Sequence, residues 1–214
     1  MNSPKKPMRM VELIIDEDNL VEGVQAMGVV TKPAIMTNFV TFSEDGEPLP
    51  KKVKFEAMNS EKRILLGPAM IPGLPIYRQD EDGDGYYNYY TAKTVEQSMQ
   101  LFMKNGRQNS ATLEHEVGVS DLTIVESWIV EDETQDKSRI YGFDVPKGTW
   151  MISMKVYSEE IWNQFIKSGV LQGFSIEGFF SDSDSQKHKD KLKTAFQAYA
   201  KLAATRAKSS KSRR

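Results

Sequence analysis

The stretch WMISMKVYSEEIWNQFIKSGVLQGFSIEGFF, residues 150–180, contains two strand patterns with a helix pattern between them. The apolar runs 150–156 and 174–180 have the length and the β-branched and aromatic content of strands. Between them, Ser158 is a suitable N-cap, two glutamates follow it in the first turn, and Gly169 can end the helix. We therefore expect a strand, a short helix and a second strand.

The remainder of the chain repeats the strand pattern and adds one more helix. Strand-like runs lie at 11–15, 24–30, 38–42, 53–57, 63–71, 111–113, 122–130 and 140–145. A helix is expected at 94–104, where Thr94 and Gln97 form a capping box and Gly106 follows the last turn. This balance predicts an α+β, β-rich domain, folded as a barrel or as a folded-over sheet.

Length and composition limit the classes of protein to consider. The 214 residues predict one domain, at 9–181, with a disordered N-terminus at 1–8 and a separate tail at 182–214. The absence of cysteine excludes a disulfide scaffold, a thiolate metal site and a cysteine nucleophile. No apolar run approaches the roughly 20 residues of a membrane span, so we expect a soluble, intracellular protein.

The formal net charge of −2 hides an uneven distribution. Residues 182–214 hold 10 of the 28 basic and 3 of the 30 acidic residues, a net charge of +7, which leaves −9 for residues 1–181. The basic tail has three interpretations: a solvated face, an arm that docks on an acidic scaffold, or a weak nucleic-acid contact. It lacks interleaved base-stacking aromatics, which argues against sequence-specific binding of nucleic acid.

The turn DEDGDG at 80–85 is a weak calcium candidate, because Asp80, Asp82 and Asp84 alternate as at the start of an EF-hand loop. The twelfth position is Thr91, where such a loop needs a bidentate glutamate. We favour an acidic hairpin turn.

His115, in LEHE at 113–116, is one of only two histidines. A zinc protease helix needs a second histidine four residues later, where Val119 stands, so a histidine-based metal site is nearly excluded. Ser175, in GFSIEG, is not in a nucleophile-elbow motif. A serine hydroxyl nevertheless becomes nucleophilic when an imidazole removes its proton, so these two residues are the candidate catalytic pair.

Several segments together resemble the phage prohead (capsid maturation) proteases, and in particular the XkdF-like phage serine proteases. They are LEHE at 113–116, VESWIVED at 125–132, the helix ending IKSG at 166–169, QGFSIEGFF at 172–180 and EGVQAMGVVTKPAIMTNFVTFS at 22–43. The resemblance touches most of residues 10–181.

The resemblance implies a fold similar to the herpesvirus assemblins, a β-barrel surrounded by helices. It implies His115 as general base and Ser175 as nucleophile, with no metal or organic cofactor. The implied substrates are the phage scaffold, the N-terminal extensions of the major capsid protein and the protease itself. Cleavage would take place in the host cytoplasm, inside the assembling procapsid or virion; no membrane partner is implied, and a homo-oligomer stays open.

The third catalytic residue is less clear. Related proteases draw an acid from a Gly-Val-Asp-Ala segment, and the matching residue here is Gln25. Glu126 is the alternative, and Glu22 and Asp121 are weaker ones. Glu177 shares a strand face with Ser175, and we expect it to be structural or to face the substrate.

Two other functions compete with the protease. The first is an inactive capsid-associated or scaffold-like protein that kept the protease fold, with Gln25 as the trace of lost activity. The second is a nucleic-acid-binding module acting through residues 187–214, which the acidic body disfavours.

Overall fold

The computed structural model describes residues 8–16, 19, 21–35, 40–43 and 61–184. The strand predicted at 53–57 lies outside these residues, as do residues 1–7 of the predicted N-terminal segment and residues 185–214 of the tail. Within the described ranges, no helix is both long and apolar enough to cross a bilayer.

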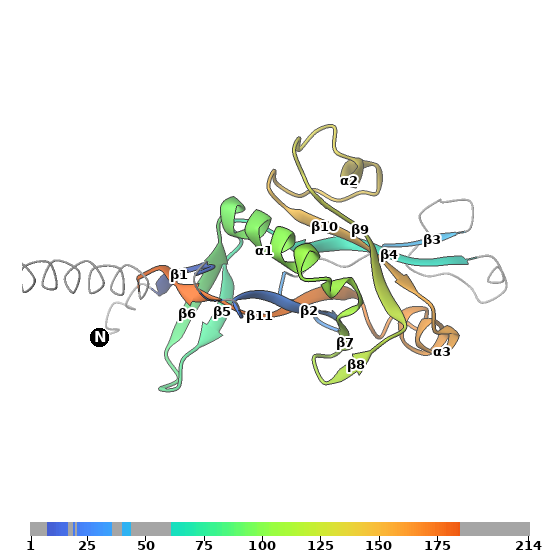
Figure 1. Cartoon of the computed structure of the whole chain (residues 1–214), viewed down its shortest axis with the longest axis horizontal. Coiled ribbons are helices and arrows are strands. Elements are labelled where there is room, and N and C mark those ends of the chain that lie inside the picture. The colour runs from blue at the N-terminus through green and yellow to red at the C-terminus, as the bar shows by residue number, and fades with distance from the viewer. Residues whose placement is uncertain (1–7, 17–18, 20, 36–39, 44–60, 185–214) are drawn as a thin grey trace, which may run out of the picture.

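The described strands assemble into three four-stranded sheets (Figure 1). Their orders are β12-β1-β6-β5, β3-β4-β10-β9 and β11-β2-β7-β8. The strands are β1 (Arg9–Ile14), β2 (Gly23–Val30), β3 (Val40–Ser43), β4 (Glu61–Met70), β5 (Ile76–Gln79), β6 (Gly85–Tyr90), β7 (Ala111–Leu113), β8 (Val117–Val119), β9 (Leu122–Ile129), β10 (Trp150–Val156), β11 (Gly173–Phe179) and β12 (Ser181–Asp182).

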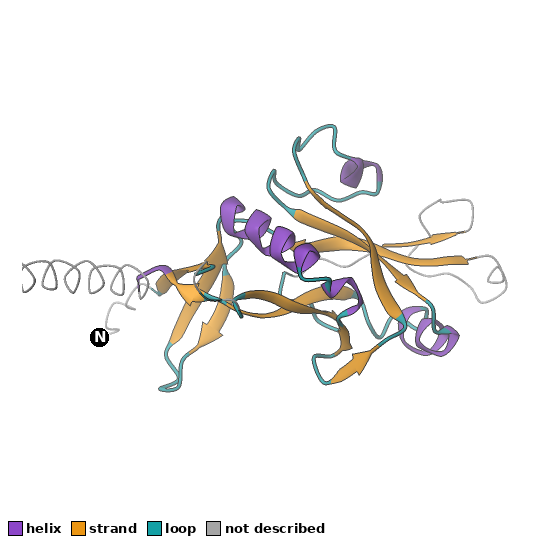
Figure 2. Ribbon diagram, in the orientation of Figure 1, coloured by secondary structure: helices purple, strands orange, loops and turns teal. Residues whose placement is uncertain are grey.

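The helices are short apart from α1, which packs against β2 and also contacts β6, β9 and β10 (Figure 2). They are α1 (Ala92–Lys104), η2 (Arg107–Asn109), α2 (Lys137–Ile140), α3 (Glu159–Ile161) and η3 (Trp162–Ile166). α3 continues directly into η3, a π-helical turn in which the Lys167 N–H donates to the Trp162 carbonyl at 2.9 Å. The α+β, β-rich class is thus confirmed.

The main core joins the second and third sheets with α1 and includes Ile76 and Tyr90 of the first sheet. Trp150 and Trp162 are both buried in it. A smaller cluster around Phe143 and Met151 covers another part of the second sheet, and Trp128 packs partly buried against it. Each large apolar side chain buried in these clusters contributes about 1.5–3 kcal/mol to folding.

The predicted barrel is not confirmed. Each of the three described sheets has two end strands, and none closes on itself. The sheets are joined through side chains in the shared core.

The helix boundaries confirm one predicted cap and correct another. Ser158 caps α3 by accepting a hydrogen bond from the Ile161 N–H, and Gly169 follows η3 with a φ of 74°. The predicted Thr94–Gln97 capping box is wrong, because α1 begins two residues earlier. Its N-cap is Thr91, whose hydroxyl accepts from the Thr94 N–H.

The strand predicted at 140–145 is also wrong. Asp136 caps α2 there, its side chain accepting a hydrogen bond from the Ser138 N–H. Gly142 then adopts a φ of 80°, which extended backbone does not allow. The apolar residues of this run were a misleading signal, since Ile140 is exposed while Phe143 and Val145 are buried in the second core cluster.

Candidate active site

The register of the third sheet brings together the residues that matter for chemistry. Three residues lie side by side across neighbouring strands: Ser175 of β11 pairs with Gly28 of β2, and Gly28 pairs with Thr112 of β7. Glu177 follows Ser175 on the same face of β11, because side chains alternate along a strand. The opposite face carries Phe174 and turns into the main core.

His115 lies in the turn that joins β7 to β8. The Glu116 N–H donates to the Leu113 carbonyl at 3.0 Å, and the two central residues, Glu114 and His115, have φ values of 53° and 62°. Two successive positive φ values are the mark of a type I′ hairpin turn. Such values are uncommon for residues other than glycine, and backbone strain of this kind clusters at functional sites.

The end of β2 holds this turn in place. The Glu114 N–H donates to the Val29 carbonyl at 3.1 Å. The Glu114 carboxylate in turn accepts the Thr31 N–H at 2.6 Å and the Thr31 hydroxyl. These bonds offset the strain of the turn and orient the residue that follows Glu114, which is His115.

The imidazole of His115 lies over Gly28. A Cβ added to Gly28 would lie 2.7 Å from Cε1 and 2.9 Å from Nδ1 of the ring, and 3.3 Å from the Ser175 carbonyl oxygen. Only glycine leaves this space free. Since Gly28 is the residue opposite Ser175, the ring lies directly beside the Ser175 position.

A carboxylate binds one side of the ring. Glu177 Oε1 lies 2.9 Å from His115 Nδ1, and the same oxygen accepts the Thr112 hydroxyl. With Nδ1 occupied, Nε2 is the nitrogen left to exchange a proton with another group. The side chains of His115 and Glu177 are about one-third exposed, at 37% and 32%, so the pair is open to solvent on one side.

The surroundings of Glu177 keep it ionised. Burial alone would raise the pKa of its carboxyl, but hydrogen bonds from Thr112 and His115 and the charge of His115 together lower that pKa below 4.5. The carboxylate is therefore negative at neutral pH, as a partner for an imidazolium must be.

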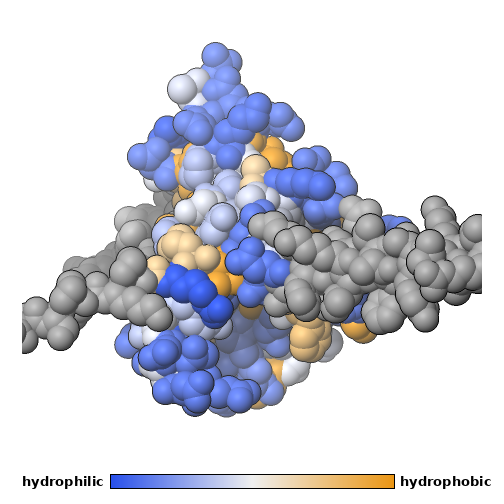
Figure 3. All heavy atoms as spheres, turned by 90° about the vertical axis from the view of Figure 1, so that its left-hand side faces the viewer, coloured by the Kyte–Doolittle hydropathy of each residue, from blue (hydrophilic) through white to orange (hydrophobic). Residues whose placement is uncertain are grey.

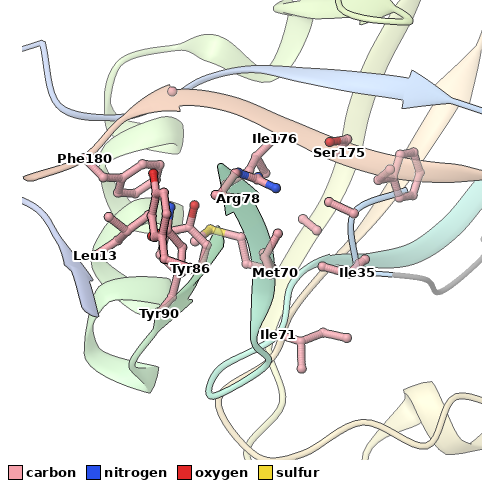
Figure 4. A pocket seen from close by; sticks show the side chains of 16 residues that line it. Leu13, Ile35, Met70, Ile71, Arg78, Tyr86, Tyr90, Ser175, Ile176 and Phe180 are labelled. Carbon is pink, nitrogen blue, oxygen red and sulfur yellow. The ribbon is translucent and has the colours of Figure 1, made fainter. Parts of the chain in front are cut away.

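Ser175 is half-buried. Within the described residues, no hydrogen bond joins the Ser175 hydroxyl to His115, and hydrogen bonds of this kind often tighten only when substrate is bound. Ser175 also borders a pocket of about 370 Å³ that touches β4, β5 and β6 (Figure 4). The serine therefore adjoins a pocket as well as the imidazole position.

The residues predicted as third catalytic member lie elsewhere. The Gln25 amide donates to the carbonyls of Val21 and Gly23, at 2.8 and 3.2 Å. Glu126 belongs to the second sheet, where it accepts the Ser153 hydroxyl at 2.6 Å and pairs with Lys137 at 2.8 Å. The structure brings neither to the imidazole.

The two weaker candidates do not reach the ring either. The Glu22 carboxylate is buried and accepts the Asp16 N–H and the Ser181 hydroxyl, both at 2.6 Å. Asp121 lies just before β9, and its carbonyl accepts the Tyr157 N–H at 2.8 Å. The acid that contacts His115 is Glu177, for which the sequence predicted a structural or substrate-facing role. The position of Glu177 on the same strand face as Ser175 was the sequence feature that pointed to the candidate catalytic site.

The three aspartates of the calcium candidate form the turn between β5 and β6. Asp80 Oδ1 accepts the Asp84 N–H at 2.8 Å, and the Gly83 N–H donates to the Asp80 carbonyl at 3.0 Å. In the part of the chain that the structure describes, no group of three or more acidic, histidine or cysteine side chains is placed to hold a metal ion. The turn has the hydrogen bonds of an acidic hairpin.

Comparison with known proteins gives a family match and one distant relative. Residues 53–183 match the family described as "Putative phage serine protease XkdF". A protein of Bacillus subtilis strain 168, "Uncharacterized protein YqbD", is 27% identical over 141 residues, which are 65% of this chain and 39% of that relative. The match thus spans about two-fifths of the relative's length, and no solved structure matches the chain. Since the family match covers more than half of the chain and contains both His115 and Ser175, the chain belongs to the XkdF family of phage serine proteases.

Proposed function

We propose that this chain is a serine endopeptidase in which Ser175 is the nucleophile, His115 the general base and Glu177 the acid that orients the imidazole. The observation that carries the proposal is the position of the ring. The ring lies over Gly28, beside the Ser175 position, and its Nδ1 lies 2.9 Å from the Glu177 carboxylate. A nucleophile next to a base, with the base contacted by an orienting acid, is the arrangement of a catalytic triad.

The reaction follows from these positions. His115 Nε2 takes the proton of the Ser175 hydroxyl as Ser175 Oγ attacks the scissile carbonyl carbon. The carbon becomes tetrahedral, and its carbonyl oxygen becomes an oxyanion. The imidazolium then gives that proton to the leaving amine nitrogen as the carbon–nitrogen bond breaks, and an acyl-serine remains. Water, deprotonated by the same imidazole, hydrolyses the acyl-serine and restores both side chains.

Glu177 has two functions in this scheme. Its hydrogen bond with Nδ1 selects the tautomer that leaves Nε2 unprotonated and aimed away from the carboxylate. Its negative charge also stabilises the imidazolium that forms during attack. Thr112 restrains the carboxylate through its hydroxyl.

The substrates we propose are the phage scaffold, the N-terminal extensions of the major capsid protein and the protease's own chain. Cleavage would occur in the host cytoplasm, within the assembling procapsid or virion. The description of the family as a phage serine protease supports this assignment. We also propose that residues 9–181 form the protease domain and that the basic tail, 182–214, docks on the scaffold through its charge of +7.

We also propose that the domain folds as a barrel like that of the herpesvirus assemblins. The β-rich fold and the core that the second and third sheets share around α1 support this proposal. An experimental structure of the full chain with one continuous closed sheet would support it, and one with separate open sheets would contradict it.

The test is co-expression of the protease with its cognate scaffold and capsid proteins. Ser175→Ala should abolish their cleavage and any self-cleavage, while its circular dichroism spectrum stays that of the wild type. Ser120→Ala, which removes an exposed hydroxyl before β9, is the matched control and should cleave normally. Equal processing by Ser175→Ala and the wild type would refute the proposed function.

A further inference from the structure

The pocket beside Ser175 has a floor made by the first sheet. In the register of this sheet, Arg78 of β5 lies opposite Tyr86 of β6, and Ile76 lies opposite Asn88. Side chains alternate along each strand, so these four share one face, and all four line the pocket. Phe180, just after β11, closes one end by packing its ring on Tyr90, with centroids 4.9 Å apart.

β11 forms the wall of the pocket that carries the serine. It is an edge strand of its sheet, paired with β2 on one side, and no residue of β2 lines the pocket. The pocket therefore runs along the side of β11 away from β2. An extended peptide can add to the edge of a sheet as a further strand, and at this edge the backbone of the peptide would lie next to Ser175.

Among the residues that the structure describes, Arg78 is the only charged one that lines the pocket. Its guanidinium donates one hydrogen bond, to the Tyr77 carbonyl at 2.9 Å, and none of the described carboxylates lies within ion-pair distance of it. In Figure 4 its side chain extends from β5 with its nitrogens on the side nearer to Ser175. Within the described part of the chain, the positive charge thus faces the pocket without a carboxylate partner.

A second cation lies on the same face as Arg78, while the acidic turn at 80–84 lies beyond Gln79 at the tip of the β5–β6 hairpin. Arg9 of β1 lies next to Tyr86 in the same row, with its guanidinium carbon 5.1 Å from the centre of the tyrosine ring. At this end of the molecule, apolar side chains reach the surface as separate patches among hydrophilic ones (Figure 3). The pocket therefore combines an apolar interior, which includes Met70 and Leu13, with a cationic side.

Asn88 shares this face of the first sheet with Arg78 and lines the same pocket. Its Oδ1 is buried and accepts no hydrogen bond from any residue that the structure describes. Because that oxygen is closed off from solvent, a bound peptide does not reach it, and the anion-binding group of the pocket is Arg78.

We propose that Arg78 makes the enzyme prefer substrates with an aspartate or glutamate side chain close to the cleaved bond. The inference rests on the proposed peptidase function, because the carboxylate belongs to the chain being cut. The guanidinium would bind the carboxylate through charge-assisted hydrogen bonds, while the apolar floor covers its methylene groups. Because Arg78 is exposed, the preference for glutamate over glutamine is about 10-fold, near the lower end of what such a bond supports.

The first experiment is cleavage of a library of capped peptides with randomised positions, followed by mass-spectrometric identification of the products. The wild type should enrich acidic residues about 10-fold at one position near the cleaved bond. Arg78→Gln should lose that enrichment, and Arg78→Glu should replace it with a preference for lysine and arginine. Arg139→Gln, which removes an equal charge next to Asp144, is the control and should keep the wild-type preference. An unselective wild type, or an acidic preference that survives Arg78→Gln, would overturn the inference.

The second experiment separates this inference from the peptidase function. Full-length Ser175→Ala is titrated with N-acetyl-glutamate methylamide and with its glutamine analogue, and NMR shifts of the Arg78 side chain and the Asn88 amide are followed. We expect the glutamate compound to bind about 10-fold more tightly, and the difference to disappear in Ser175→Ala/Arg78→Gln. Equal binding of both compounds overturns the pocket assignment even if peptides are cleaved. If Ser175→Ala binds the glutamate compound selectively but the wild type cleaves no peptide, the acidic-side-chain pocket is supported and the proposed peptidase function is refuted.

Discussion

Replacing Glu177 with glutamine tests how the site activates its base. The amide keeps the size of the side chain and can still contact Nδ1, but it carries no negative charge. At the observed separation of 2.9 Å, Coulomb's law gives about 1.4 kcal/mol in bulk water and about 6 kcal/mol at an effective dielectric constant of about 20. Both side chains of the pair are about one-third exposed, so the true value lies between these limits.

At about 1.4 kcal/mol per tenfold change in rate, these limits correspond to about 10-fold and about 10⁴-fold, and the middle of the range predicts that Glu177→Gln lowers kcat about 10²- to 10³-fold. The assay is turnover of a peptide substrate, with kcat and KM measured separately from pH 5 to 9. KM should change little, since Glu177 acts through the imidazole.

Glu126→Gln is the matched control, because Glu126 was the other acidic candidate and pairs with Lys137 in another sheet. It should leave both kcat and the pH profile unchanged. If Glu126→Gln lowers kcat as much as Glu177→Gln does, or if Glu177→Gln retains wild-type turnover, the assignment of Glu177 is refuted.

Three further predictions concern the support of the site. Gly28→Ala should reduce kcat at least about 10²-fold with little loss of stability, because the new methyl displaces the imidazole and crowds the Ser175 carbonyl oxygen, 3.3 Å away, only slightly. Gly118→Ala, with open space around it, should have no effect, and equal activities of the two variants would contradict the reasoning. Thr31→Val removes one hydroxyl donor to Glu114 and should lower the free energy of unfolding by about 1 kcal/mol in urea, together with a fall in kcat, and an unchanged kcat would show that this anchor does not position His115. The pKa of Glu177 is lowered in the folded protein, so its contribution to stability is fully present above about pH 4.5 and is lost as the pH falls further; the stability advantage of the wild type over Glu177→Gln in urea titrations should therefore shrink below pH 4.5, and a constant difference would argue against the ion pair.

The parts of the fold that followed from sequence are those where local chemistry and tertiary packing agree. The run 150–156 forms β10 with the predicted bounds, since every second side chain and most of those between are buried. Ser158 caps its helix because no competing cap stands nearby. By contrast, Thr91 and Thr94 offer the same chemistry three residues apart, and only the position of α1 on β2 decides between them.

The candidate site, too, could be predicted from sequence only in part. The residue types at positions 115 and 175 indicate a base and a nucleophile, but their arrangement depends on the register of β11, β2 and β7. Gly28 is an ordinary strand glycine in the sequence, and its meaning comes from lying between Ser175 and Thr112. Gln25 was considered because of a motif; the hydrogen bonds of its amide to Val21 and Gly23 could not be foreseen from that motif.

The most direct test of the central claim is labelling with a fluorophosphonate, which reacts with a serine only when a base activates it and needs no knowledge of the substrate. Intact-mass measurement and peptide mapping should show one adduct per chain, on Ser175. His115→Ala should abolish that adduct, and a variant of the other histidine, His188→Ala, should retain it. No adduct on Ser175, or an equal yield in His115→Ala, would contradict the claim that these two residues form a catalytic pair.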